Sequence, residues 1–168
     1  MNKLLNILHY PDERLHLIAK PVKNFDNSLL DIIEKMKYTM YHNNGIGLAA
    51  TQVNIQLQLF IMDINNPNED ETTLQVFINP KIISHSGSSS TEEGCLSVPG
   101  IYQHITRATN IELSYQDQYG NLHIKSYDGL MATCIQHELD HLNGKVFVEY
   151  LSSLKQDIIR KKMKKLQK

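Results

Sequence analysis

Several features that mark large classes of protein are scarce or absent in this sequence. The 168 residues contain no run near the roughly 18 consecutive apolar residues of a membrane-spanning helix, so we expect no membrane span. The formal net charge of −1 gives the chain no strong attraction to DNA. No internal repeat is visible, and the length suits one domain covering residues 1–168.

Cysteine is also scarce, with Cys95 and Cys134 alone. Residues 1–10 lack the apolar core of a secretory signal, so we expect a cytoplasmic protein with reduced thiols. Cys134 falls inside a predicted helix, and we interpret it as a small buried hydrophobe. Cys95 lies in a Gly-containing turn after a polar stretch, where a metal ligand or a nucleophile is more common than a core residue.

The residues that carry chemistry are concentrated in His-Glu-Leu-Asp-His at positions 137–141. Helix positions i and i+4 share a face, so His137 and His141 can bind one metal ion with Glu138 beside them as a base. Cys95 is the best candidate for a third ligand. Three protein ligands and one open position are typical of a catalytic metal site.

The segment around this pentad has the pattern of a helix over 129–142. Asp128 is a candidate N-cap, and Asn143-Gly144 is a candidate helix stop. An apolar stripe at helical spacing indicates a core-facing helix, and it comprises Leu130, Cys134, Ile135, Leu139 and Leu142. Two histidines on such a helix are costly without partners, which a metal supplies.

Other interpretations of these residues remain open at this point. The pentad alone also fits two solvated histidines, or an H-E-x-x-H metallopeptidase. One peptidase class needs a third histidine six residues after the second, but Phe147 stands there and cannot bind a metal. A thiol protease with a Cys–His pair would leave Glu138 and one histidine unexplained. The other histidines lack ligand spacing, and we expect them to be surface or structural residues: His9, His16, His42, His85, His104 and His123.

The remaining pattern is that of an α+β protein, with strands in the middle of the chain. We predict helices at 28–42, 129–142 and 152–167. Strands are predicted at 57–64 and 74–79 around a polar turn at 65–71, and a hairpin is predicted from 109–115 and 122–127. The Ser-rich segment 84–90 is predicted to be a mobile loop.

Three spaced motifs, together with the residues around them, strongly resemble the peptide deformylases. They are Gly-Ile-Gly-Leu-Ala-Ala-Thr-Gln at 45–52, Glu-Gly-Cys-Leu-Ser at 93–97 and Gln-His-Glu-Leu-Asp-His at 136–141. Residues 7–15 and 128–130 also look like that family, so the resemblance runs nearly end to end. It implies antiparallel sheets packed around a central helix that carries the histidine pair, plus a C-terminal helix. It also implies removal of the formyl group from the initiator methionine of nascent chains.

The resemblance further implies a role for each site residue. Cys95, His137 and His141 would bind the metal, expected to be Fe(2+) in the cell, with Ni(2+), Co(2+) or Zn(2+) as substitutes. Glu138 would take a proton from the attacking water and pass it to the leaving amine. The Gln52 side chain and the Leu96 backbone N–H would stabilise the oxyanion. A non-catalytic relative would be signalled by loss of Glu138 or Gln52, and both are present.

Substrate contacts are implied in the same way, with the formyl-methionyl peptide bound as an added strand. Backbone groups of Ile46, Gly47 and Gly94 would hold that strand. The walls of the methionine pocket would be Ile46, Leu130, Thr133, Cys134 and the face of His137. The chain departs from many relatives in three places, which affects the pocket and the peptide clamp: Thr133, Tyr102 and Asn44.

The end of the chain is strongly basic, since six of the nine residues at 160–168 are Lys or Arg. One interpretation is a solvated helix face, with Ile158, Ile159, Met163 and Leu166 packed inward. The other is contact with ribosomal RNA, as the resemblance implies.

Overall fold

The computed structural model describes residues 3–64 and 73–167, which form an α+β arrangement of two antiparallel sheets and three α-helices. The larger sheet has the strand order β1–β2–β3–β6–β7, with bounds Gly47–Ala49, Leu59–Met62, Gln75–Ser86, Asn110–Gln116 and Leu122–Asp128. The smaller sheet is a hairpin of β4 (Ser89–Cys95) and β5 (Val98–Arg107). The polar turn predicted at 65–71 lies outside the described residues.

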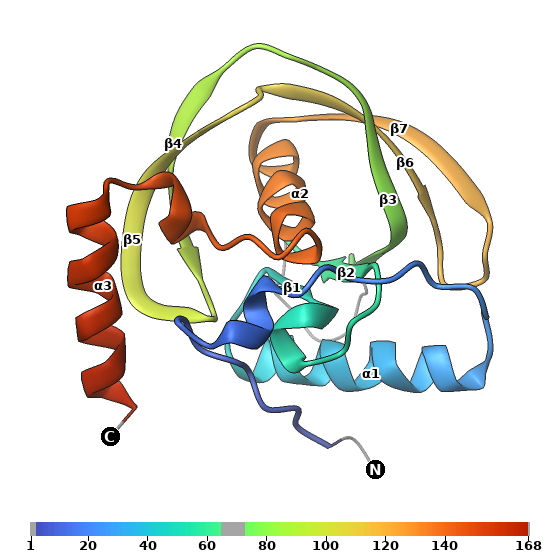
Figure 1. Cartoon of the computed structure of the whole chain (residues 1–168). Helices are drawn as coiled ribbons and strands as arrows, with labels where there is room; N and C mark the ends of the chain where they lie inside the picture. The colour runs from blue at the N-terminus through green and yellow to red at the C-terminus, as the bar shows by residue number, and fades with distance from the viewer. Residues whose placement is uncertain (1–2, 65–72, 168) are drawn as a thin grey trace.

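Helix α2 (Gly129–Leu142) lies between the two sheets, as Figure 1 shows. Its side toward the larger sheet buries Ala132, Ile135 and Leu142 in a cluster with Phe60 and Phe77. The apolar spacing therefore predicted this helix correctly, although Leu130 at its start is 56% exposed. Asp128 is its N-cap residue, and Gly144 follows with a φ of +76°.

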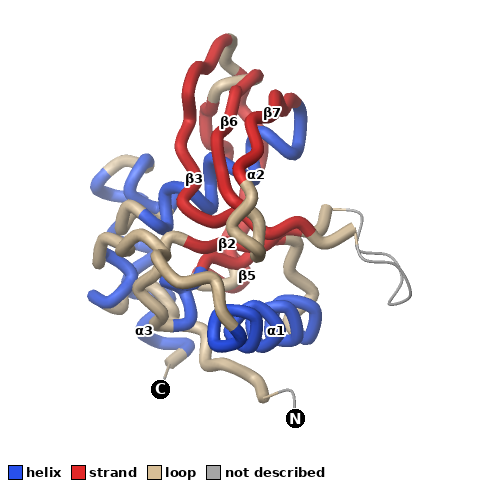
Figure 2. Tube along the Cα trace, turned by 90° about the vertical axis from the view of Figure 1, so that its right-hand side faces the viewer, coloured by secondary structure: helices blue, strands red, loops and turns tan. Residues whose placement is uncertain are grey.

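Helix α1 (Asn27–His42) begins where Asp26 accepts a hydrogen bond from the Leu29 backbone N–H, at 3.0 Å. Its buried face packs on β1 and β2 in a second cluster, through Leu29, Ile33, Met36 and Met40. Figure 2 shows the long strands β3, β6 and β7 lying together at one end of the molecule and α1 at the other.

Helix α3 (Ser153–Leu166) lies on the outside of the β4–β5 hairpin (Figure 1). Ile159 and Met163 are buried in a third cluster with Tyr10 and Val98. The expectation that four residues pack inward was wrong for Ile158 and Leu166, which are 57% and 62% exposed. Only one narrow face of α3 packs against the hairpin. Ile159 and Met163 are four residues apart and share that face, whereas Ile158 and Leu166 point away from it.

The Ser-rich segment 84–90 was predicted to be a loop, and this was wrong. Ser84 and Ser86 continue β3 by pairing with Glu112 and Asn110, and Ser89 already pairs with Arg107. Backbone pairing with distant strands holds a segment whose side chains carry no apolar alternation. The predicted helices and the hairpin of β6 and β7 are confirmed. Among the described residues, no helix has both the length and the apolarity needed to cross a membrane.

Candidate metal centre

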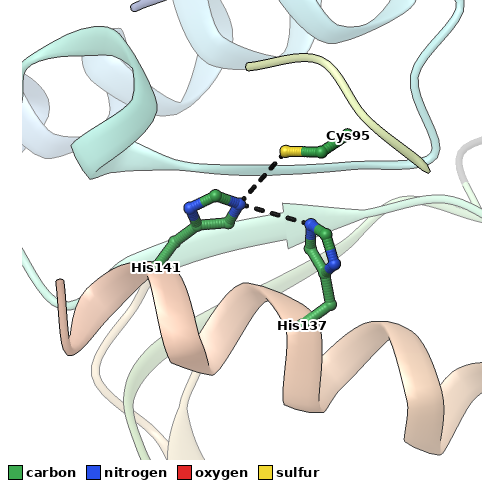
Figure 3. A group of neighbouring side chains, drawn as sticks. All are labelled: Cys95, His137 and His141. Atoms are coloured by element: carbon green, nitrogen blue, oxygen red, sulfur yellow. Dashed lines mark hydrogen bonds between the residues drawn. The ribbon is translucent and has the colours of Figure 1, made fainter. Parts of the chain in front are cut away.

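Cys95, His137 and His141 meet between the end of β4 and the C-terminal half of α2. Figure 3 shows the thiol and the two imidazoles pointing toward one another. The Nε2 atom of His141 is 3.3 Å from Cys95 Sγ and 3.3 Å from His137 Nε2. Cys95 is the last residue of β4 and pairs with Val98 across the turn, so its predicted place within the turn was wrong by one position.

These positions fit a metal ion. Donor atoms around a tetrahedral ion with bonds of about 2.0–2.3 Å lie about 3.3–3.6 Å apart. All three donor atoms lie within 4.8 Å of one another, and no other such group of three exists among the described residues. Burial holds the pKa of His141 well below its usual value, which keeps the imidazole neutral as metal binding requires. A thiolate and two imidazoles suit zinc and the transition metals rather than magnesium or calcium.

Glu138 lies beside this cluster and is buried, with 5% of its surface exposed. Its Oε2 atom has no hydrogen-bond partner among the described residues, and burial raises the pKa of its carboxyl group to about 7. Next to the other carboxylate oxygen, a Cβ added at Gly47 would lie 2.8 Å from Glu138 Oε1. The chain therefore passes the carboxylate at a distance that only glycine permits.

A buried ion-pair network holds His137 from behind, and the sequence analysis did not identify it. Glu93 Oε1 accepts a hydrogen bond from His137 Nδ1 at 2.9 Å. Arg107 donates to both oxygens of Glu93 and, through Nη1, to Asp140 Oδ2 at 2.9 Å. Tyr150 also donates to Asp140 Oδ2, at 2.8 Å. Such a carboxylate fixes the tautomer and the ring plane of a metal-binding histidine.

Ion pairing determines the charge states of Glu93 and Arg107. Burial alone would raise the pKa of Glu93, but His137 and Arg107 hold it below its usual value. Burial would lower the pKa of Arg107, yet Glu93 and Asp140 raise it. Both groups are therefore charged at neutral pH. One feature of the sequence could have identified Arg107. It lies an even number of residues from Ile101 and Ile105 on β5, and therefore on the same face of the strand. All three are buried, so a charged residue on this face needs a partner.

Gln52 is fixed just beyond the thiol. Its Oε1 atom accepts from the Ala49 N–H at 2.9 Å, and its Nε2 donates to Ser97 Oγ at 3.0 Å. The same Nε2 lies 3.5 Å from Cys95 Sγ. The amide is thus held by its neighbours with its N–H group at the cluster. Ser97, missed in the sequence analysis, helps to orient it.

A cavity of about 1160 Å³ opens onto this cluster. The structure brings every predicted site residue except His141 to its wall: Ile46, Gly47, Gln52, Gly94, Cys95, Leu96, Leu130, Thr133, Cys134, His137 and Glu138. His141 is reached through its contact with Cys95. Burial raises the pKa of Cys134 to about 12, so this wall residue is an uncharged thiol.

Two strand edges border the same cavity. β1 is the end strand of the larger sheet, and β4 pairs with β5 alone, so each has one edge outside its sheet. Gly47 and Gly94 lie on these two strands and line the cavity. The part of the cavity between β1 and β4 is therefore bordered by backbone N–H and C=O groups of the kind that pair with an extended peptide.

The histidines expected to be structural lie outside the metal cluster. His16 Nδ1 is 3.0 Å from Glu149 Oε1, and His123 Nε2 is 2.8 Å from Asp117 Oδ2. Phe147, at the position where one peptidase class has a third histidine, is buried with its ring 6.1 Å from that of His137.

Known proteins match nearly the whole chain. A sequence model of the family described as polypeptide deformylase matches residues 4–157. The peptide deformylase of Chromobacterium violaceum is 54% identical over 165 residues, which are 98% of this chain and 97% of that protein. A crystal structure of a peptide deformylase from Legionella pneumophila has a TM-score of 0.92 at 44% identity, over 98% of this chain and 96% of that one. A Met-Ala-Ser-bound peptide deformylase from Acinetobacter baumannii has a TM-score of 0.83 at 34% identity, over 90% and 100%.

Proposed function

This chain belongs to the polypeptide deformylase family, and we propose how its own residues perform the family's reaction, the removal of N-formyl groups from nascent chains. The observation that carries the proposal is the Cys95–His137–His141 cluster, with Glu138 beside it in one cavity. The family match also disfavours the metallopeptidase alternative. We further propose that residues 1–168 act as one catalytic domain in the cytoplasm.

In this proposal Cys95, His137 and His141 hold the metal. When bound, the metal would supply the Lewis acidity that makes water a nucleophile near neutral pH. Glu138 takes a proton from that water and delivers it to the amine that leaves. Glu93 and Arg107 keep His137 in the orientation that directs Nε2 at the cluster.

The oxygen of the formyl group becomes negatively charged as water attacks its carbon. We assign its stabilisation to the Gln52 side-chain amide and the Leu96 backbone N–H. Gln52 is buried and held by two hydrogen bonds before substrate arrives, so no reorganisation is needed during the reaction. Loss of one such donor typically costs on the order of 10²–10³ in rate.

The metal in the cell is proposed to be Fe(2+), with Ni(2+), Co(2+) and Zn(2+) as substitutes. A thiolate with two imidazoles is a donor set that all four ions accept. Both Fe(2+) and the Cys95 thiolate can be oxidised, so the activity of the iron-loaded protein should decay in air. Metal analysis of protein purified without oxygen tests this assignment, and zinc or nickel as the main metal would contradict it.

The substrate is proposed to be an N-formyl-methionyl peptide that adds a strand between β1 and β4. Backbone groups of Ile46, Gly47 and Gly94, which line the cavity, would make the strand pairing. The methionine side chain would enter between Ile46, Leu130, Thr133 and Cys134. The Acinetobacter relative bound to Met-Ala-Ser supports a methionyl peptide in this family.

Helix α3 is proposed to contact the ribosome. Its exposed residues include Lys161, Lys162, Lys164 and Lys165. The helix lies on the outer side of the β4–β5 hairpin, which leaves these cations free to meet RNA phosphates (Figure 1).

The test of the reaction is formate release from formyl-Met-Ala-Ser by nickel-loaded protein, with Glu138→Ala in parallel. We expect formate from the wild type and a loss of about 10²–10⁴ in the variant, with nickel still bound. Equal rates would remove Glu138 from the mechanism. No formate from loaded wild-type protein would overturn the proposed reaction.

The metal ligands have a separate test. Cys95→Ala should lose most of its nickel, whereas Cys134→Ala should keep it, since only Cys95 lies in the cluster. Full nickel binding by Cys95→Ala would favour a site of the metallopeptidase type, which has no use for this thiol.

A further inference from the structure

Asp140 is a charged residue of the motif at 137–141 that the proposed reaction does not use. It is absent from the described residues that line the cavity at the metal cluster. Its side chain is 21% exposed and borders a separate hollow of about 510 Å³, together with Arg107 and Tyr150. Any effect of Asp140 on the reaction must therefore pass through other residues.

A continuous chain of hydrogen bonds connects Asp140 to His137. Asp140 Oδ2 accepts from Arg107 Nη1 at 2.9 Å, and the same guanidinium donates to both oxygens of Glu93. Glu93 Oε1 in turn lies 2.9 Å from His137 Nδ1. The side chains of Arg107 and Glu93 are each 5% exposed, so water screens this chain of contacts very little. A change of charge at Asp140 should therefore be felt at His137.

One guanidinium serves two carboxylates in this network. Arg107 neutralises Glu93 less completely while it also pairs with Asp140. Glu93 therefore keeps more negative charge than it would in an isolated pair, and it is a stronger acceptor for His137. A stronger acceptor makes a metal-binding imidazole a better electron donor. Asp140 thus increases the donation from His137.

Tyr150 opposes this effect from the outer end of the network. Its hydroxyl donates to the same Asp140 Oδ2 at 2.8 Å, from the short 3₁₀ helix Phe147–Tyr150. Lys145 Nζ lies 3.9 Å from the centre of the Tyr150 ring, and this cation–π contact helps to hold the ring in place. The hydrogen bond withdraws charge from Oδ2 and weakens its hold on Arg107.

We propose that Asp140 is a positioning residue that, opposed by Tyr150, sets the electron donation of His137 to the metal through Arg107 and Glu93. This inference rests on the proposed function for the metal site. It requires that removing the two groups has opposite effects on the metal, which a general loss of packing would not produce.

The first experiment measures nickel affinity by competition with a chelator. Asp140→Asn keeps the shape of the side chain and removes its charge, and it should weaken nickel binding by about 10-fold, as is typical for a lost partner of a metal-binding histidine. Tyr150→Phe removes only the hydroxyl and should tighten binding. Weaker binding in both variants would overturn the proposal, because it would indicate damage to the fold.

The second experiment records the visible spectrum of the cobalt-loaded protein. With less donation from His137 the Co(2+) ion is more electron-poor. The charge-transfer band from the Cys95 thiolate should therefore move to longer wavelength in Asp140→Asn and to shorter wavelength in Tyr150→Phe. A band at the wild-type position in both variants would overturn the proposal even if the affinities differ.

Asp12→Asn and Tyr119→Phe are the matched controls. Asp12 pairs with Arg14 at 2.7 Å and is 26% exposed, close to the exposure of Asp140. Tyr119 is 69% exposed in the turn between β6 and β7. Both variants should keep the wild-type nickel affinity and cobalt band. An equal shift in either control would overturn the proposal, since the network would then be no better connected to the metal than a remote surface group.

Formate release separates this proposal from the reaction itself. On formyl-Met-Ala-Ser, Asp140→Asn should change kcat and keep KM, because Asp140 is absent from the cavity wall. A raised KM at unchanged kcat would overturn the proposal, since it would give Asp140 a role in peptide binding. If loaded wild-type protein releases no formate, the proposed function fails while the affinities and spectra still decide the role of Asp140. If wild type binds neither nickel nor cobalt, both proposals fail.

Discussion

Glu138 shows how burial sets the chemistry of one side chain. Burial raises the pKa of its carboxyl group to about 7 in the metal-free protein, whereas a nearby dication favours the carboxylate and lowers it again. As a base, Glu138 must be ionised. We therefore predict that kcat/KM of the nickel enzyme falls as the pH drops through a value between about 4.5 and 7.

The measurement is a pH profile of formate release from pH 4.5 to 8.5, with bound nickel measured at each pH. A flat profile over that range, with nickel retained, would contradict the assignment. Activity that rises toward acid would contradict it too, since it would require the protonated carboxyl group.

Residue spacing predicted the histidine pair of the candidate metal cluster, but not the groups that lie behind it. His137 and His141 are four apart on a helix, so their common face follows from local geometry alone. Glu93, Arg107 and Asp140 lie on three different elements, and no local pattern pairs them. Long-range ion pairs of this kind become visible only in the folded chain.

Arg107 joins β4, β5 and α2 through its two carboxylate partners. Replacing it with Ala leaves Glu93 buried beside His137 without its cation, and we predict a loss of about 3–5 kcal/mol in the free energy of unfolding. Urea unfolding of metal-free protein measures this.

Arg14→Ala is the matched control for that experiment. Arg14 makes a similar pair with Asp12, but its side chain is 51% exposed, so the urea midpoint should change little. Equal shifts in the two variants would show that burial of the Arg107 network is not what stabilises this part of the fold.

The hairpin of β6 and β7 depends on Asp117 in its turn. Asp117 Oδ1 accepts from the N–H groups of Tyr119 and Asn121 at 2.9 and 3.0 Å, and Oδ2 lies 2.8 Å from His123 Nε2. Burial alone would raise the pKa of Asp117, but these hydrogen bonds, led by that of His123, lower it to about 2.

Because the folded pKa is depressed, this contribution to stability is full above the unfolded value of about 3.9 and is lost as the pH falls toward 2. We predict that Asp117→Ala costs about 1–2 kcal/mol at pH 6. Its difference from wild type should shrink between pH 4 and 2 in thermal unfolding. A constant difference across that range would refute this account. Asp31→Ala, on an exposed helix pair, should show no such pH dependence.

The helices were predictable because their determinants are local. Asp26 and Ser152 cap α1 and α3 through their own side chains, and apolar spacing marks the buried face. The strand segments at 84–90 were missed because their determinants lie some twenty residues away, in β5 and β6. The overall arrangement followed from the family resemblance rather than from residue patterns, and the structural matches confirm it.

The exposed lysines of α3 form the surface that we propose contacts the ribosome. We predict that Lys→Gln changes at positions 161, 162, 164 and 165 together weaken co-sedimentation with ribosomes and reduce its salt dependence. Activity on formyl-Met-Ala-Ser should not change, because these residues are absent from the cavity wall. Ile159 and Met163 stay in place, which makes substitution a cleaner test than deleting residues 160–168.

The same four positions changed to Arg provide the control, since the charge is kept. Unchanged co-sedimentation of the Gln variant would contradict the ribosome proposal. Weakening by the Arg variant would point to a loss of helix packing instead.

The third cluster joins segments that lie far apart in the sequence. Ile159 and Met163 come from the last described helix, yet they pack with Leu8 and Tyr10. Arg160 also donates to the Tyr10 hydroxyl at 3.3 Å. Val98 of the same cluster pairs with Cys95. Detachment of α3 would therefore expose the apolar side chains of Leu8, Tyr10 and Val98 together. The segment around Tyr10 and the strand beside Cys95 should then lose their protection from amide hydrogen exchange as one unit.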